Sequence, residues 1–316
     1  MHKKRSPFLM SVLFVIVAAT CGRTYAAEYI QKDFSALFAA IGDDFESKTA
    51  AKWKEQLKRP HPTVATIRKY FDDAAIEFGV PSEVLQAIGQ VEANWTQLGP
   101  SVDQGWGVMH LVQNSYRDTL GEAAKALGSD PQLLKDDAKQ NIRGAAALLA
   151  RYAGSDRASF TRLEDWFAAV KLVVGLKDDD LQELEAMTIF GVILKGSVST
   201  TLWGEKIRLL PHENVNVKQK ATRGRGDIAP MLTDTNNGIV PMSTDYGPAL
   251  WNSADSSNWG SGRTHTIDTW VNHWIGVGTY AGTIQWFRTP VGQGGRTAPK
   301  LRELRAKGRG RRIFLV

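Results

Sequence analysis

The residue most clearly suited to chemistry is Glu92, which follows an apolar helical run and precedes a glycine-rich turn. Ile88, Val91 and Trp95 are spaced to surround its carboxyl group. An apolar surrounding raises the pKa of a glutamate, and such a carboxyl group is a general acid at neutral pH. Glycoside cleavage needs a proton of this kind on the leaving oxygen, so a sugar chain is the first substrate class that Glu92 indicates.

A second carboxylate, Asp103, lies in the turn that follows, and two schemes of cleavage are chemically sound. Glycosidases commonly use two carboxylates, and Asp103 is the nearest second candidate, although it lies on a loop. In the other scheme Glu92 works alone: it donates its proton, becomes a base, and the C6 hydroxyl of muramic acid attacks C1 to form an anhydro bond. A purely structural role, as a solvent-facing glutamate at a helix end, is the third interpretation of Glu92.

Three motifs follow one another around Glu92. They are Gln90-Val-Glu92-Ala-Asn-Trp95, Gly105-Trp-Gly-Val-Met109 and Asn141-Ile-Arg-Gly144. In this order and spacing, residues 70–153 resemble the lytic transglycosylase (SLT) domains of the lysozyme-like superfamily. The resemblance implies a helical domain that binds peptidoglycan, with Glu92 as catalytic general acid and base. The substrate-binding residues that it implies are Trp95, Gly107, Met109, His110 and Asn141.

Two departures from the family pattern change the cleft that we expect. The family usually has glutamine where this chain has His110, which either replaces it as a hydrogen-bond partner or packs locally. The family also places a Tyr-Asn pair after a later tryptophan, whereas Trp166 is followed here by small and apolar residues up to Val174. The cleft should therefore lack one hydroxyl and one amide, and a non-catalytic peptidoglycan-binding module is the alternative to an active enzyme.

The aromatic-rich block at residues 246–287 carries a second set of motifs. They are Trp251-Asn-Ser-Ala-Asp-Ser-Ser-Asn-Trp259, His265-Thr-Ile-Asp-Thr-Trp-Val-Asn-His273 and Gly278-Thr-Tyr-Ala-Gly-Thr-Ile-Gln-Trp-Phe287. They resemble the opening of the zinc-dependent N-acetylmuramoyl-L-alanine amidases of the peptidoglycan-recognition type. The resemblance implies that His273 is the first zinc ligand. Because no histidine or cysteine follows it, we expect a truncated domain that does not bind zinc. The N-terminal domain needs no cofactor.

The positive charge of the chain lies at its two ends. The whole chain carries +6, residues 1–27 hold four basic and no acidic groups, and residues 288–316 hold nine basic groups and one acidic group. The body between them is mildly acidic, so nucleic-acid binding is not expected. Residues 1–27 also have the basic start, short apolar run and small residues of a signal peptide, which predicts a secreted or periplasmic protein without a transmembrane segment.

The last residues, 288–316, are rich in Arg, Lys and Gly and have neither period nor core, so a disordered tail is expected. Two explanations fit this composition. The first is a shift of reading frame near codon 288, which severed an ancestral amidase domain. The second is a genuine cationic tail that binds anionic wall polymers or a lipid surface.

The fold class that we expect is mainly α: a lysozyme-like helical domain at 28–210, then the first strand and helix of an incomplete α/β amidase domain at 246–287. Helices are expected at 34–57, 63–78, 82–92, 113–128, 131–153, 163–176 and 181–194, a linker at 211–245, a strand at 265–274 and the start of a helix at 280–287. The predicted function is a peptidoglycan hydrolase of the amidase or lytic transglycosylase type. An inactive, truncated copy of a zinc amidase is the further alternative.

Overall fold

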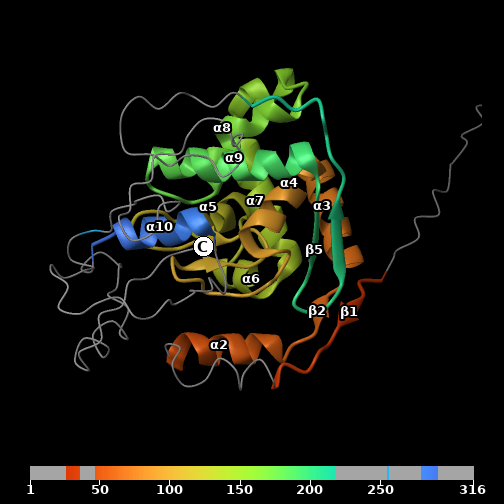
Figure 1. Ribbon diagram of the computed structural model, residues 1–316, viewed down its shortest axis with the longest axis vertical. Coiled ribbons are helices and arrows are strands. Elements are labelled where there is room, and N and C mark those ends of the chain that lie inside the picture. Colours follow the sequence, from red (N-terminus) through yellow and green to blue (C-terminus); the bar gives the residue numbers. More distant parts are fainter. Residues whose placement is uncertain (1–25, 36–46, 218–254, 256–278, 291–316) are drawn as a thin grey trace, which may run out of the picture.

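The computed structural model describes residues 26–35, 47–217, 255 and 279–290, and this part of the chain is mostly helical (Figure 1). The helices are α2 (Ser47–Leu57), α3 (Val64–Phe78), α4 (Ser82–Ala93), α5 (Thr119–Leu127), α6 (Pro131–Asp136), α7 (Ala138–Ala153), α8 (Phe167–Val173), α9 (Asp179–Lys195) and α10 (Tyr280–Arg288). Two 3-10 helices, Gly154–Ser159 and Leu163–Trp166, lead from α7 to α8. The mainly-α fold class is confirmed.

The strands form three short antiparallel pairs. They are β1 (Tyr29–Ile30) with β2 (His61–Pro62), β3 (Gly105–Trp106) with β4 (Leu111–Val112), and β5 (Ser197–Thr200) with β6 (Lys206–Leu209). The β5–β6 hairpin was not predicted. It contacts the C-terminal end of α4, where the Asn94 side chain donates to the Thr200 carbonyl and Gln90 donates to the Ser199 hydroxyl. The hairpin therefore braces the helix that carries Glu92.

Helix α7 is the centre of the bundle, packed against α3, α5, α6 and α8 (Figure 1). Its small residues let the neighbouring helices approach closely. A Cβ atom on Gly144 would lie 2.8 Å from a methyl group of Leu134 and 3.0 Å from Ala123. The packing of α5 and α6 against α7 therefore depends on this run of small side chains.

A second, smaller core lies at the N-terminal side of the bundle. Phe34, Trp53 and Leu57 pack there with Leu98 and Trp203. The Trp53 indole also donates to the carbonyl of residue 100, at 3.0 Å. Helix α2 is thereby attached to the loop that leads from α4 to the β3–β4 hairpin.

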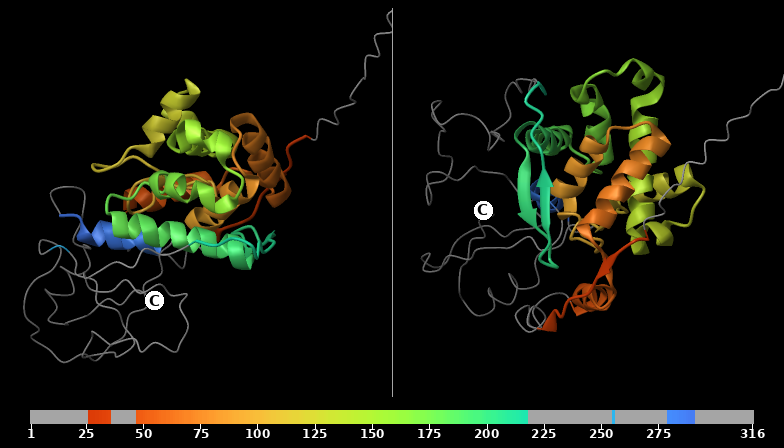
Figure 2. Two further views of the ribbon diagram at one scale, coloured as in Figure 1. Left: turned by 90° about the horizontal axis from the view of Figure 1, so that it is seen from above. Right: turned by 90° about the vertical axis from the view of Figure 1, so that its right-hand side faces the viewer.

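Helix α10 comes from a segment more than sixty residues beyond β6, yet it packs beside the N-terminal end of α9 (Figures 1 and 2). Thr279 caps it by accepting from the Gly282 N–H, at 3.0 Å. Ala281 and Ile284 are buried in the main core. The predicted start of a helix at 280–287 is confirmed.

The predicted helices differ from the observed ones in three places. The helix expected at 131–153 is two helices, because Asp137 is extended and its side chain caps α7 by accepting from the Gln140 N–H. The helix expected at 113–128 begins only at Thr119, where Asp118 supplies the cap. The segment 163–176 begins as a 3-10 helix before α8.

Several predictions lie outside the described residues. They are most of the signal peptide at 1–27, the first half of the helix at 34–57, nearly all of the linker at 211–245, the strand at 265–274, His273, and most of the tail at 288–316. Within the described part, no helix is long and apolar enough to cross a membrane.

Candidate active site

Glu92 is the penultimate residue of α4, and the helix ends just beyond it for a local reason. Asn94 takes the left-handed conformation, with φ of 47°, and its N–H bonds back to the carbonyls of Gln90 and Gly89. A Cβ atom on Gly89 would lie 2.8 Å from the ring of Phe71, so α4 packs tightly along this face. The Glu92 side chain consequently points into the protein and is only 2% exposed.

His110 lies at the end of the tight turn between β3 and β4, with φ of 49°. Its imidazole lies directly over the backbone of Gly105, where an added Cβ atom would come within 2.1 to 2.6 Å of the ring. The Ser101 hydroxyl accepts from the Gly105 N–H at 2.7 Å and fixes the start of the strand. The glycine in the sequence motif therefore makes room for the histidine.

Asn141, on α7, hydrogen-bonds to the backbone of this turn. Its Oδ1 accepts from the Met109 N–H at 2.8 Å, and its Nδ2 donates to the carbonyls of Trp106 and Leu134 at 3.0 Å each. Gly107 has φ of 75°, and a Cβ atom there would lie 2.4 to 2.7 Å from the Asn141 amide. In this structure the buried Asn141 amide thus binds the loop backbone that positions His110.

The imidazole of His110 lies between two carboxyl groups. Its Nδ1 is 3.1 Å from Oε2 of Glu92, and its Nε2 is 3.1 Å from Oδ1 of Asp103. Ser101 Oγ is 2.9 Å from Nε2 and itself donates to Asp103. The contact with Glu92 is close but is not a well-aligned hydrogen bond. Because both ring nitrogens face acidic oxygens, the arrangement favours the doubly protonated imidazolium.

The pKa values of these three residues diverge. Burial raises the pKa of Glu92 above its usual range, and the neighbouring His110 only partly opposes this. Burial alone would also raise the pKa of Asp103, but His110 and the Ser101 hydroxyl hold it below its usual range. Burial would lower the pKa of His110, yet Asp103 and Glu92 raise it well above the usual value. These shifts favour the carboxylate form of Asp103, the imidazolium form of His110 and the protonated form of Glu92.

Glu185, on α9, is a fourth buried ionisable group that sequence reasoning missed. It is 3% exposed, and burial, followed by the proximity of Glu92, raises its pKa well above the usual value. Its position could have been read from the sequence. Glu185 lies four residues after Leu181 and four before Ile189, on the stripe that α9 buries. A glutamate on a buried stripe is a candidate functional residue.

Two oxygens of this group have no hydrogen-bond partner among the described residues. They are Oε1 of Glu92 and Oε1 of Glu185, both on side chains more than nine-tenths buried. A buried carboxyl oxygen without a partner is costly for the fold, and such groups cluster at functional sites. Glu92, Asp103, His110 and Glu185 together form the acidic cluster.

The other residues implied by the resemblance lie in the core. Trp95 is fully buried, its indole donates to the Gln86 carbonyl at 3.0 Å, and it packs against the ring of Phe71. Met109 is also buried. Val173 and Val174, at the place of the missing Tyr-Asn pair, are buried in the main core. No open aromatic platform is therefore formed by Trp95 in this structure.

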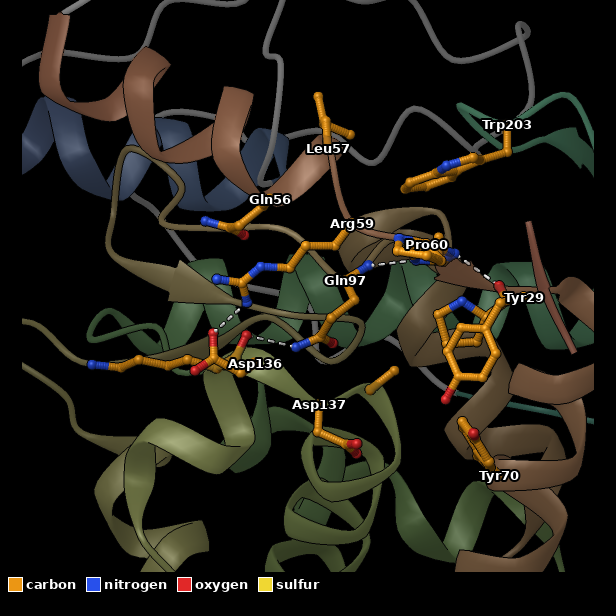
Figure 3. A pocket seen from close by; sticks show the side chains of 14 residues that line it. Tyr29, Gln56, Leu57, Arg59, Pro60, Tyr70, Gln97, Asp136, Asp137 and Trp203 are labelled. Atoms are coloured by element: carbon orange, nitrogen blue, oxygen red, sulfur yellow. Dashed lines mark hydrogen bonds and ion pairs between the residues drawn. The ribbon is translucent and has the colours of Figure 1, made fainter. Parts of the chain in front are cut away.

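A separate cavity of about 90 Å³ lies between the β1–β2 pair, α2 and α6. Figure 3 shows Arg59, Gln97 and Asp136 pointing toward one another on one side, and Tyr70 and Trp203 on the other. Arg59 pairs with Asp136 at 3.3 Å, and Gln97 donates to the Lys135 carbonyl. The acidic cluster does not line this cavity. We take the acidic cluster as the candidate site, because it brings three buried carboxyl groups and an imidazole together and two of its carboxyl oxygens have no partner among the described residues.

In the described part of the chain, no group of three or more His, Cys, Asp and Glu side chains is arranged to hold a metal ion. His110 is unsuited to ligation, since both of its ring nitrogens face carboxyl groups. His273, the zinc ligand that the amidase resemblance implies, lies outside the described residues. The buried carboxyl groups and the imidazole of residues 92, 103, 110 and 185 are groups that can transfer protons.

Comparison with known proteins adds no family assignment. No model of a known protein family matches the chain, and none of the curated proteins matches it either.

Proposed function

We propose that the chain is a peptidoglycan-cleaving enzyme of the lytic transglycosylase type, with a lysozyme-like helical domain and Glu92 as its general acid. The observation that supports this most directly is the state of Glu92: buried, with a raised pKa, and with Oε1 free of any partner among the described residues. A carboxyl group that keeps its proton to a higher pH than usual and has an unused oxygen is suited to protonating a leaving group.

The first chemical step follows from this geometry. Oε1 of Glu92 donates its proton to the glycosidic oxygen, and the bond between that oxygen and C1 breaks. The Glu92 carboxylate that remains is stabilised by the His110 imidazolium, 3.1 Å from Oε2. Asp103 contacts the other ring nitrogen, Nε2, and stabilises the positive charge of the imidazolium. His110 and Asp103 are thus positioning residues that act through Glu92.

The second step returns the proton. The C6 hydroxyl of the muramic residue attacks C1, its proton passes to the Glu92 carboxylate, and a 1,6-anhydro sugar is the product. Neither water nor a cofactor is consumed. If water attacks instead, the same proton transfers give a reducing sugar, and the enzyme is a hydrolase of the lysozyme type.

The choice of peptidoglycan as substrate is supported by the motif resemblance around Glu92 and His110, and by the signal-like segment at 1–27, which favours a secreted or periplasmic protein. The amidase activity suggested by residues 246–287 would need zinc at His273 and further ligands, and it stays a separate prediction. A zinc determination on the purified protein tests it, since stoichiometric zinc would support an amidase site.

The closed state of the acidic cluster favours a second candidate function, a peptidoglycan-binding module without catalysis. All four side chains of the cluster are at most 4% exposed. In that case wall binding would persist in every variant of Glu92, and no soluble sugar would be released by the wild-type protein.

The test compares wild-type protein with Glu92→Gln on purified sacculi, with the products identified by mass spectrometry. We expect anhydro-muropeptides from the wild type and a loss of rate of about 10²- to 10⁴-fold in the variant. Wall binding should be unchanged. Glu77→Gln is the matched control, because Glu77 is a glutamate near the end of α3 that pairs with Arg143 at the surface. Equal rates in wild type and Glu92→Gln would contradict the proposal.

A further inference from the structure

The acidic cluster is closed to solvent in this structure. Glu92 and His110 are each 2% exposed, Glu185 is 3% and Asp103 is 4%. A polysaccharide cannot reach Oε1 of Glu92 while the cluster is closed, although that oxygen has no partner among the described residues. Some covering element must therefore move before a glycan chain can be protonated.

The N-terminal turn of α10 is one element that covers the cluster. Gly282 lies so close to Asp103 that an added Cβ atom would be 2.8 Å from Oδ2 of the carboxylate. The Thr279 hydroxyl lies near enough to Glu185 to oppose the rise of its pKa. The start of α10 thus lies against two of the four groups, Asp103 through Gly282 and Glu185 through Thr279.

The rest of α10 is fastened to the start of α9. Oε1 of Gln285 accepts from the backbone N–H groups of Lys177 and Asp178, at 3.2 and 2.9 Å. One guanidinium nitrogen of Arg288 lies 3.2 Å from Asp178 and 3.0 Å from Asp180. The Arg288 side chain is 24% exposed, so the ion pairs at this end lie partly in water, whereas Gln285 itself is buried.

We infer that α10 is a built-in plug of the acidic cluster, and that the cluster becomes accessible when α10 leaves α9. The occupant is a segment of the same chain, and Gly282 permits its close approach to Asp103. The exposed ion pairs of Arg288 are the contacts that solvent, salt or an anionic wall polymer reaches first. The consequence for catalysis rests on the proposed function of Glu92; the physical closure of the cluster does not.

Two full-length variants loosen α10 by different means. Arg288→Glu replaces the attraction to Asp178 and Asp180 by repulsion. Gly282→Phe places a ring where only hydrogen fits beside Asp103. Arg143→Glu is the matched control, since it also reverses an arginine in a carboxylate ion pair, with 28% side-chain exposure, and Arg143 pairs with Glu77 on α3.

Each protein is measured in two ways. The first is modification of His110 by exchange of its imidazole Cε1 hydrogen for deuterium, which proceeds from the imidazolium form and is read by peptide mass spectrometry. His61 is the internal control for unfolding, because it is buried and stacked on Trp203 away from α10. The second is the rate of sugar release from sacculi. In both loosened variants we expect His110 to be modified at least several-fold faster, with His61 still protected, and sugar to be released faster than by wild type and Arg143→Glu.

The other outcomes separate the two proposals. Unchanged modification of His110 in both variants overturns the plug. Faster modification with sugar release that stays at or falls below a measurable wild-type rate supports the closure by α10 and overturns its consequence for catalysis. Faster modification with no sugar released by any version supports the closure by α10 and contradicts the proposed function. If one variant also exposes His61, that variant is unfolded and the other one decides.

Discussion

Two glutamates of the helical body each face a basic side chain, and their pKa values move in opposite directions. Glu77, on α3, forms a two-point ion pair with Arg143, with 2.7 Å between Nε and Oε2, and its pKa is lowered by that hydrogen bond. Glu92, on α4, faces His110 at 3.1 Å, yet its pKa is raised.

The difference lies in the surroundings rather than in the partner. The Glu77 side chain is 42% exposed, so water and Arg143 together stabilise its charge. The Glu92 side chain is 2% exposed. Its charged form loses more free energy with its hydration than it gains from the interaction with one imidazolium. A cation beside a carboxylate is therefore a poor guide to its protonation state until burial is known. Four variants test this comparison.

Asn141→Ala should have the largest effect on stability. The substitution leaves the buried Met109 N–H without its acceptor and removes one donor from each of the Trp106 and Leu134 carbonyls. We expect a loss of about 3 kcal/mol in the free energy of unfolding, measured by urea denaturation. A loss below about 1 kcal/mol would show that the turn carrying His110 does not depend on Asn141.

His110→Gln should shift the pH profile of activity. The proposed acid must be protonated, so activity is lost as pH rises through the pKa of Glu92. His110 lowers that pKa, and its removal lets burial and Asp103 raise it further. The alkaline limb of the rate profile should therefore move to higher pH.

His61→Gln is the matched control for that shift. His61 is also buried, but burial lowers its pKa to about 4, so its side chain is neutral near pH 7. Its replacement by glutamine should therefore leave the alkaline limb of the rate profile unchanged. A limb that moves to lower pH in His110→Gln would contradict the electrostatic account of Glu92.

Glu185→Gln should stabilise the fold at neutral pH. The raised pKa means that the folded state keeps a proton that the unfolded chain loses near its usual pKa of 4.5. Wild-type stability therefore falls as pH rises from that value toward the raised pKa, and the glutamine variant lacks this loss.

Urea denaturation of Glu185→Gln at pH 7 and at about pH 4 measures this difference. The gain should exceed the roughly 0.5 kcal/mol typical of surface substitutions at pH 7 and should shrink toward zero at the lower pH. An equal gain at both values would show that Glu185 does not hold a proton in the folded state.

Arg143→Ala should have the smallest effect. Its ion pair with Glu77 lies at the surface, with 28% and 42% of the two side chains exposed. We expect a loss of at most about 1 kcal/mol in the free energy of unfolding, reduced further by salt. A loss as large as that of Asn141→Ala would remove the contrast between the surface pair and the buried network.

Much of the candidate site could be predicted because it is local in the chain. Glu92, Asp103 and His110 lie within nineteen residues, and the glycines between them indicated a tight turn. The cap at Asp137, which splits the helix expected at 131–153, was also readable, since its side chain accepts from the N–H three residues later.

The remaining features are products of tertiary packing. Glu185 joins the cluster only because α4 packs against α9, and Gly282 reaches Asp103 from almost 180 residues away. Nothing in the local pattern of residues 279–288 indicates which surface the helix will cover. Asn141 was selected correctly as a residue of interest, but only the fold shows that its amide is used by the backbone of the turn.

The central claim is that Glu92 keeps its proton to a higher pH than an ordinary glutamate does. The direct measurement is a ¹³C NMR titration of the glutamate carboxyl groups in the full chain, with Glu92→Gln and Glu77→Gln used to assign the two signals. The account predicts a midpoint for Glu92 above the usual value of about 4.3 and one for Glu77 below it. A Glu92 midpoint at or below the usual value would contradict the claim that burial makes it the general acid.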